Sequence, residues 1–419
     1  MVFYGQPARH PVIAGLILFH TYSIMSSTIN LIKSIDYGDK MSSINYNFPA
    51  SIIFGWDESE KIAKHVESIA ASKPLIVTDE GIERAGILRR ISESLEEKGT
   101  CYTVFKGVHP NPTEKDVEDG LRSYREEKCD SIIALGGGSP MDAAKAILTV
   151  VNHPGKLEQY YVGAPDRRMI TEKIPPFIAI PTTSGTGSET SRGAIITDSH
   201  NRKRAVSSPH LLPIIVLLDP SLTVGMPPKL TAYTGLDALS HNLEAFVIDL
   251  YAPICDAFAR EGMRLVSKSL IKAYEEGNDR DARSDMMMAS TMGSMAFMKG
   301  LGAVHSLAHQ LSSQRDIPHG AACGLMMPHV VRYNLSEKKT WNKYMEVADI
   351  LGGEDAKEVP LLLDKLLESL GVEQRLSKWG VTEEDVLVMS KKAMLDHCHP
   401  RNPRACTEDS MAELYRSAL

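Results

Sequence analysis

Short apolar runs and amphipathic stretches alternate along the first half of the chain. The apolar runs are rich in β-branched residues and are mostly continuous, rather than alternating with polar residues. They occupy residues 51–54, 74–77, 101–105, 131–135, 177–180 and 214–218. Because strands of a parallel sheet are buried on both faces, continuous apolar runs are typical of them. The pattern therefore predicts strands of a parallel sheet at these positions.

The stretches between these runs carry apolar residues at helical spacing. They lie at residues 58–71, 82–98, 114–128 and 141–151. Strands that alternate with helices favour βαβ units, in which each helix crosses one face of the sheet. We therefore expect an α/β domain with a Rossmann-like, doubly wound parallel sheet over residues 46–228.

The pattern changes after Met226-Pro227-Pro228, where β-branched runs become rare. Long stretches with helical spacing follow, many of them rich in Met and Ala, at residues 231–246, 256–277, 282–298 and 355–369. We expect an all-α second domain over residues 229–419.

The first 45 residues differ from both of these parts. An apolar run at residues 11–19 resembles the core of a signal peptide, but no small-residue cleavage site follows it promptly. The run is also shorter than the about 20 apolar residues that span a bilayer. We interpret residues 1–45 as an atypical extension upstream of a later start, with Met41 as a candidate. A targeting sequence is the alternative.

Composition argues against several classes of protein. Lys and Arg number 46 against 53 Asp and Glu, so the formal net charge is −7, and no basic cluster is present to neutralise nucleic-acid phosphates. The 6 cysteines form no C-x-x-C pair, which disfavours both a disulfide framework and a thiolate zinc knuckle. We therefore expect a cytoplasmic protein with reduced thiols that binds neither nucleic acid nor membranes.

A glycine triplet, Gly136-Gly137-Gly138, lies between a predicted strand and a predicted helix. Glycines let the backbone approach a ligand closely, and the free N–H groups of the first helical turn form a site for a pyrophosphate. The loop is neither the G-x-G-x-x-G fingerprint nor a Walker loop, and an ordinary glycine turn is the alternative.

Two further features follow strands of the same predicted sheet. Residues 182–190 are dense in Ser, Thr and Gly and offer donors for the rest of a dinucleotide, although such loops also occur on surfaces. Asp79 follows the strand at residues 74–77, at the edge where open α/β sheets bind ligands. Its carboxylate would accept from ribose hydroxyls and repel a 2′-phosphate, which favours NAD over NADP. A helix N-cap is its competing role.

A set of histidines and one carboxylate marks the second half. Asp237 and His241 are four residues apart on a predicted helix, His305 and His309 repeat that spacing on another, and His319 follows. Residues four apart share a helix face. A carboxylate with three imidazoles suits Fe²⁺, Zn²⁺ or Mn²⁺ rather than Ca²⁺. Lone histidine pairs are often structural, but this combination predicts a metal site.

Together these segments resemble the iron-containing (group III) alcohol dehydrogenase family. The matching segments are residues 136–145 (GGGSPMDAAK), 181–189 (PTTSGTGSE), 234–241 (TGLDALSH) with Glu244, and 300–320 (GLGAVHSLAHQLSSQRDIPHG). Residues 107–113 and 402–404 fit the same pattern, so the resemblance covers about residues 46–419.

The resemblance implies a role for each candidate residue. The implied metal ligands are Asp237, His241, His305 and His319, and His309 is implied as the catalytic histidine near the nicotinamide. The implied cofactor-binding residues are Asp79, Gly138, Ser139, Asp142, Thr182, Thr183 and Lys203. The implied cofactors are NAD, with NADP less favoured, and Fe²⁺, with Zn²⁺ as the alternative.

The implied activity is hydride transfer between an alcohol and NAD, with the metal polarising the substrate oxygen. We expect a small alcohol or aldehyde substrate and a homo-oligomer of two or more chains. Glycerol-dehydrogenase-like or dehydroquinate-synthase-like zinc enzymes, or a nucleotide-binding protein without turnover, are the alternatives. Residues 320–324 (GAACG) depart from the family, which commonly has an Asn-Ala pair there, and the sequence does not name the alcohol.

Overall fold

The computed structural model describes residues 44–419. The apolar run at residues 11–19 and Met41 therefore lie outside the described residues. Tyr46–Leu419 form one compact unit, which is described by itself.

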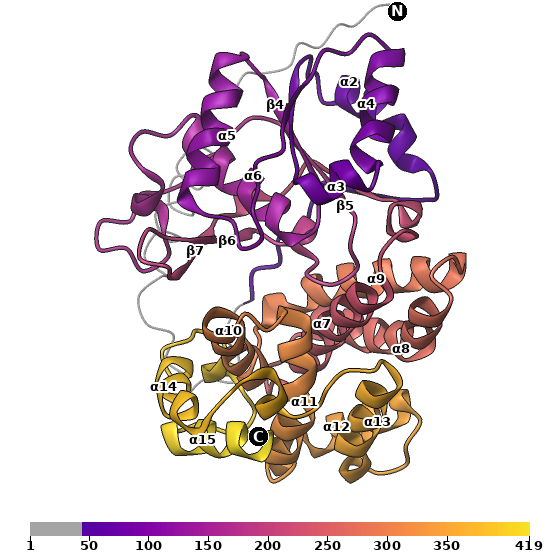
Figure 1. Ribbon diagram of the computed structural model, residues 1–419, viewed down its shortest axis with the longest axis vertical. Helices are drawn as coiled ribbons and strands as arrows, with labels where there is room; N and C mark the ends of the chain where they lie inside the picture. Colours follow the sequence, from indigo (N-terminus) through magenta and orange to yellow (C-terminus); the bar gives the residue numbers. More distant parts are fainter. Residues whose placement is uncertain (1–43) are drawn as a thin grey trace, which may run out of the picture. The chain divides into compact units, whose positions relative to one another are not determined.

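A six-stranded parallel sheet forms the centre of the first part of this unit (Figure 1). Its strands lie in the order β1-β8-β5-β4-β2-β3, and every neighbouring pair is parallel. The strands are β1 (Ser51–Phe54), β2 (Pro74–Val77), β3 (Thr103–Phe105), β4 (Ser131–Gly136), β5 (Phe177–Pro181) and β8 (Ile215–Leu218). The continuous apolar runs of the sequence therefore form the predicted strands.

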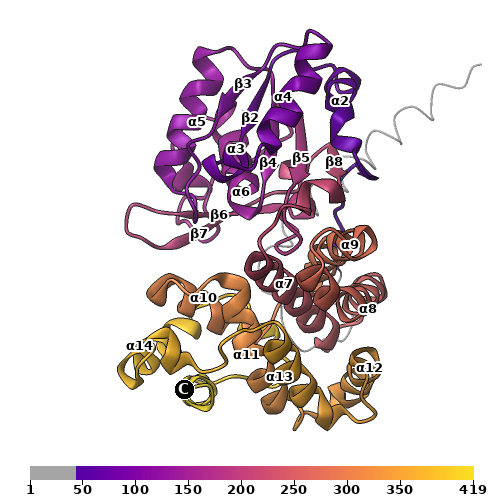
Figure 2. The same ribbon diagram turned by 45° about the vertical axis from the view of Figure 1, so that its right-hand side comes forward.

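Helices cover both faces of this sheet (Figure 2). Ile132 and Ala134 of β4 pack on one face with α5 (Glu114–Glu126) and α6 (Gly138–Val151). Ile133 and Leu135, which point the opposite way, pack with α2 (Ile62–Ser68) and α4 (Ile87–Glu97). Successive strand residues point to opposite faces, so a strand between two helical layers is apolar throughout. The predicted doubly wound α/β architecture is confirmed.

Local features differ from the expected pattern in two places. The helix expected at residues 82–98 divides into α3 (Glu80–Arg84) and α4, because Gly86 adopts a φ of 74° between them. An antiparallel pair that we did not predict, β6 (Gly193–Thr197) and β7 (Lys203–Ser207), forms outside the main sheet. The polar residues of β7 and the partly exposed ones of β6 hide this pair from a search for apolar runs.

The rest of the chain is helical, as expected. Its α-helices are α7 (Pro228–Val247), α8 (Pro253–Glu275), α9 (Arg280–Ala296), α10 (Ala303–Arg315), α11 (His319–Asn334), α12 (Trp341–Leu351), α13 (Val359–Ser369), α14 (Glu383–Ala393) and α15 (Glu408–Ser417). Helix α7 is buried along nearly its whole length and packs against α8, α9 and α11. No helix within residues 44–419 is long and apolar enough to cross a bilayer.

The loop after β5 contacts this helical part directly. A Cβ atom on Gly185 would lie 2.9 Å from the carbonyl oxygen of Thr234 on α7, and one on Gly187 would lie 2.7 Å from that of Ser290 on α9. The Thr291 hydroxyl donates to Glu189 Oε1 at 3.1 Å. Only glycine permits backbones to approach this closely. The hydroxyl-rich loop is therefore held against α7 and α9.

Candidate metal centre and cofactor loops

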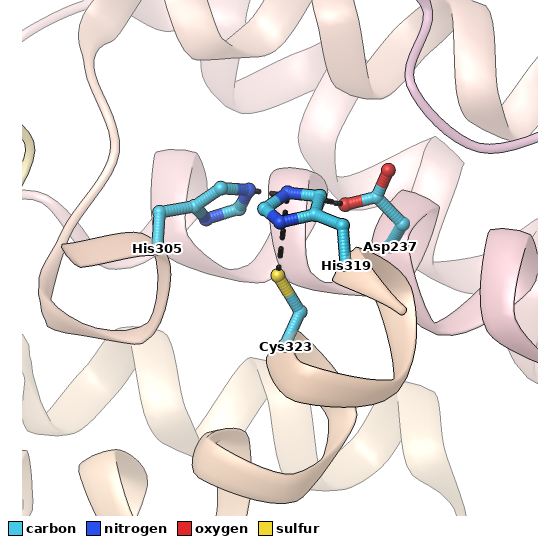
Figure 3. Close-up of side chains that lie close together, drawn as sticks. All are labelled: Asp237, His305, His319 and Cys323. Atoms are coloured by element: carbon cyan, nitrogen blue, oxygen red, sulfur yellow. Dashed lines mark hydrogen bonds and ion pairs between the residues drawn. The ribbon is translucent and has the colours of Figure 1, made fainter. Parts of the chain in front are cut away.

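Three of the four predicted metal ligands converge on a carboxylate oxygen of the fourth. Helix α7 carries Asp237 and His241, α10 carries His305, and α11 begins at His319. The Oδ1 atom of Asp237 lies 3.8 Å from His241 Nε2, 3.9 Å from His305 Nε2 and 3.5 Å from His319 Nε2. Figure 3 shows the side chains of Asp237, His305 and His319 turned toward one another. The four side chains that the sequence analysis grouped therefore lie close together in the structure.

The atoms of this cluster fit a divalent cation. Asp237 Oδ1 and His305 Nε2 are buried and have no hydrogen-bond partner. Unpaired polar atoms are costly in a protein interior, which suggests that a ligand satisfies them. Donors about 2.1 Å from one tetrahedral ion lie about 3.4 Å apart, close to the separations observed. Burial also lowers the pKa of His305 and His319, which keeps both imidazoles neutral, as ligation requires.

Glu244, one turn beyond His241 on α7, orients one of these histidines. Its Oε2 lies 2.6 Å from His305 Nδ1, and its Oε1 accepts from the backbone N–H of Val304 at 2.6 Å. Burial raises the pKa of Glu244 to about 7, against the lowering effect of these hydrogen bonds. A proton held on Nδ1 leaves the lone pair of Nε2 directed at the cluster. Such carboxylate partners fix the ring orientation of metal-binding histidines.

We expect Glu244→Gln to weaken divalent-metal binding by about 10–100-fold, because the amide cannot satisfy both His305 and Val304 as the carboxylate does. Competition with a chelator at fixed pH measures the effect. Glu346→Gln, which removes only a surface ion pair with Arg260, serves as the control. Equal metal affinity in the two variants would contradict the orienting role.

Cys323, which was not among the predicted ligands, also lies at this cluster. Within residues 44–419, one group of candidate ligand atoms lying within 4.8 Å of one another consists of Asp237, His305, His319 and Cys323. Figure 3 shows the thiol of Cys323 directed at the ring of His319. His241 stands beside this group, within reach of Asp237. His319 and Cys323 are four residues apart at the start of α11, a spacing that puts them on one helix face but does not by itself distinguish a ligand from a small core residue.

His309 lies beside the cluster and is held by a carboxylate that the sequence analysis missed. Its ring stacks on that of His319 at 5.4 Å, and its Nδ1 lies 2.8 Å from Asp396 Oδ2. Asp396 Oδ1 also accepts from Ser306 Oγ and from the backbone N–H of Cys398. Burial opposes the charge of Asp396, but the hydrogen bond from His309 lowers its pKa well below the usual range. This carboxylate is therefore ionised.

The two predicted cofactor loops lie against each other. A Cβ atom on Gly138 would lie 2.9 Å from Thr186 Cγ2, and one on Gly137 would lie 3.2 Å from Thr183 Oγ1. Gly137 caps α6 without a side-chain hydrogen bond, so the first N–H groups of that helix remain for a ligand. The hydroxyls of Thr182 and Ser184 are buried and have no partner. Glycine backbone and unsatisfied hydroxyls together fit a phosphate-bearing cofactor.

Asp142 and Lys145 of α6 are hydrogen-bonded to the loop after β5 and to the start of β6. Asp142 accepts from Ser188 Oγ at 2.7 Å and from the backbone N–H of Ile195 at 2.9 Å. The Lys145 ammonium donates to the carbonyl oxygens of Ser188 and Gly193. Burial raises the pKa of Asp142 and lowers that of Lys145 to about 8. Both side chains are thus already engaged in holding the loop after β5 and the start of β6.

The remaining predicted cofactor residues lie at the starts of three different elements, α3, α6 and β7. Asp79 lies two residues beyond the end of β2, and its Oδ1 caps α3 by accepting from the Ile82 N–H at 3.0 Å. Ser139 lies in the first turn of α6. Lys203 begins β7 and is exposed at its surface. Partial desolvation lowers the pKa of its ammonium, which interacts electrostatically with Asp142 and Cys323. Lys203 is therefore within electrostatic range of Asp142, another predicted cofactor residue, and of Cys323.

Known proteins match both parts of the chain. The profile of iron-containing alcohol dehydrogenases matches residues 49–220, and that of the C-terminal region of the same family matches residues 231–419. The 4-hydroxybutyrate dehydrogenase of Cupriavidus necator is 38% identical over 360 residues, which cover 84% of this chain and 93% of that protein.

Two further relatives are similar to this chain over their full length. The NAD-dependent methanol dehydrogenase of Bacillus methanolicus is 33% identical over 385 residues, covering 90% of this chain and 100% of that protein. A crystal structure of 1,3-propanediol oxidoreductase superposes with a TM-score of 0.86 at 34% identity, covering 90% of this chain and 100% of the other. The chain therefore belongs to the iron-containing alcohol dehydrogenase family and is an oxidoreductase that acts on CH–OH groups.

Proposed function

We propose that the chain is an NAD-dependent, metal-dependent alcohol dehydrogenase whose metal is held by Asp237, His241, His305 and His319. The observation that carries this proposal is the convergence of three imidazoles on one buried, unpartnered carboxylate oxygen. A divalent ion bound there would polarise the substrate oxygen. Fe²⁺ is the proposed metal and Zn²⁺ the alternative, since the donor set accepts both.

The cofactor loops would bind NAD, whose nicotinamide accepts the hydride. We assign the pyrophosphate of NAD to the N-terminus of α6, with Gly138 and Ser139 in contact and the hydroxyls of Thr182 and Thr183 beside them. The packing of Gly185 against Thr234, one turn before Asp237, supports a nicotinamide position next to the metal centre. The relative from Bacillus methanolicus is named as NAD-dependent, in line with this cofactor.

His309 is the proposed proton acceptor. Oxidation of an alcohol sends a hydride to the nicotinamide and a proton to a base. Asp396 holds Nδ1 of His309, which leaves Nε2 as the nitrogen that exchanges this proton. The ring of His309 lies 6.0 Å from that of His305, at the rim of the metal cluster. Asp396 acts through His309 and is a positioning residue.

Replacing His309 by Gln should lower kcat by about 10²-fold while bound metal stays unchanged, because a proton acceptor is lost and no ligand is. Asp396→Asn should lower kcat less and shift the acidic limb of the pH profile, since an amide does not hold the same histidine tautomer. Steady-state kinetics across pH with metal analysis checks both variants. Loss of metal together with activity would mean a structural role instead.

Asp79 is proposed to select NAD by binding a ribose hydroxyl. Asp79→Asn keeps an oxygen that caps α3 but removes the charge that repels a 2′-phosphate. The ratio of kcat/KM for NAD to that for NADP should fall by about 10–100-fold, the value of one charged hydrogen bond. Asp79→Ala, which also loses the cap, separates the two roles. An unchanged ratio in both variants would exclude Asp79 from cofactor selection.

A panel of alcohols, diols, hydroxy acids and the matching aldehydes tests the proposed activity, with NADH absorbance as the readout. Turnover of at least one small alcohol with NAD supports it. Glycerol alone as substrate would favour the glycerol-dehydrogenase-like alternative. Cofactor binding without turnover of any member would favour a non-catalytic nucleotide-binding protein.

The chain is further proposed to be a cytoplasmic protein that assembles into a homo-oligomer. The 6 cysteines all lie within the described residues and are all free thiols, which supports a reducing, cytoplasmic setting. A homo-oligomer is proposed because Tyr251, 82% exposed, and Ile254 present apolar surface around the start of α8. Light scattering of the purified chain measures its mass, and a monomer would exclude the oligomer.

A further inference from the structure

Cys323 lies among polar groups although it is fully buried. It follows His319 by one turn of α11, so both side chains share one face of the helix. Its Sγ lies 3.7 Å from His319 Nε2, and its thiol interacts with the carboxylate of Asp237. A free cysteine in a core usually behaves as a small apolar group. This one instead borders a carboxylate and an imidazole whose atoms point at a common centre.

The separations around this thiol match those of metal ligands. Sulfur at about 2.3 Å and nitrogen at about 2.1 Å from one tetrahedral ion lie about 3.6 Å apart. The observed distance from Cys323 Sγ to His319 Nε2 is 3.7 Å. The sulfur also lies within 4.8 Å of the ligand atoms of Asp237 and His305. All of these atoms can therefore surround a single ion without a change of backbone.

We propose that the sulfur of Cys323 is a further ligand of the divalent ion assigned to Asp237, His241, His305 and His319. The proposal rests on the proposed metal-dependent function and adds a soft donor to a set of oxygen and nitrogen donors. Such a donor favours Zn²⁺ over Mn²⁺ and Mg²⁺, which prefer oxygen ligands. The metal centre of this chain would then be a mixed nitrogen, oxygen and sulfur site.

Coordination requires the thiolate. Burial raises the pKa of Cys323 well above its usual value, so the thiol is protonated when no cation is bound. A bound divalent ion deprotonates a coordinating thiol outright, and the proton is released to solvent as the metal–sulfur bond forms. No change of oxidation state is involved.

X-ray absorption at the zinc edge tests the proposal on the full chain, stripped of metal and reloaded with Zn²⁺. The variants are Cys323→Ala and Cys323→Ser. Cys398→Ala is the matched control, because Cys398 is a second buried thiol that interacts electrostatically with Cys323. We expect a sulfur shell at about 2.3 Å in the unsubstituted chain and in Cys398→Ala, and only nitrogen and oxygen near 2.1 Å in both Cys323 variants.

The possible results distinguish failure of the Cys323 ligand from failure of the proposed metal-dependent function. Zinc bound through nitrogen and oxygen alone in the unsubstituted chain overturns this inference and leaves the proposed function intact. A sulfur shell that persists in Cys323→Ala, or vanishes in Cys398→Ala, overturns it as well. A chain that binds no zinc and no iron contradicts the proposed function itself. If Cys323→Ala does not fold, the unsubstituted chain, Cys323→Ser and Cys398→Ala still give the answer.

Discussion

Replacing His305 by Ala should remove bound metal and alcohol oxidation together. The Nε2 atom of His305 is a buried candidate ligand atom without a hydrogen-bond partner, and it lies 3.9 Å from Asp237 Oδ1. Its loss also leaves Glu244 without the histidine that it orients. A metal ion contributes several kcal/mol to stabilisation of the transition state, so we expect activity to fall by at least about 10³-fold. Metal analysis of the purified variant and NADH absorbance measure the two effects.

His200→Ala is the matched control, because His200 is exposed between β6 and β7 and belongs to neither loop nor cluster. It should keep its metal and its activity. A His305→Ala variant that retains one metal ion per chain and full turnover would place the metal elsewhere.

Replacing Gly320 by Ala should destabilise the fold and disrupt the metal centre at once. A Cβ atom at this position would lie 1.8 Å from the carbonyl oxygen of Tyr233 and 3.2 Å from Asp237 Cβ. The clash is with backbone, so α11 must move away from α7 to relieve it. His319 precedes Gly320 and would move with α11, away from Asp237. We expect a loss of about 3 kcal/mol of folding stability, with weaker metal binding.

Gly225→Ala provides the comparison, because its added methyl group meets nothing within 4 Å. Its stability should change by no more than about 0.5 kcal/mol. Chemical denaturation and metal titration of both variants test the prediction. A Gly320→Ala chain with unchanged denaturation midpoint and unchanged metal affinity would contradict the close approach of α7 and α11.

The sequence predicted those features that depend on local periodicity. The parallel strands could be recognised because burial on both faces makes each of them apolar throughout, as in β4 and β5. Asp237 and His241 could be grouped because residues four apart share a helix face. The contact between His305 and Asp237 has no such local signal. It was inferred from the combination of one carboxylate with several histidines, and the resemblance to a known family implied the same ligands.

Other features depend on contacts that periodicity does not encode. Asp396 reaches His309 from a segment beyond α14, far along the chain. Cys323 lies in a run of Ala and Gly, and a single cysteine in such a run is typical of a small residue in the hydrophobic core. The pair of β6 and β7 has little continuous apolar sequence because it lies outside the main sheet. Such groups become visible only when the tertiary structure brings them together.

A divalent ion at the Asp237 cluster should be required for NAD-linked alcohol oxidation. The most direct test strips the chain of metal, adds Fe²⁺ or Zn²⁺ in steps, and follows NADH formation against metal bound per chain. We expect no turnover in the stripped chain, a linear rise in rate that saturates at about one ion per chain, and no recovery in His305→Ala. Full turnover in the stripped chain would contradict it.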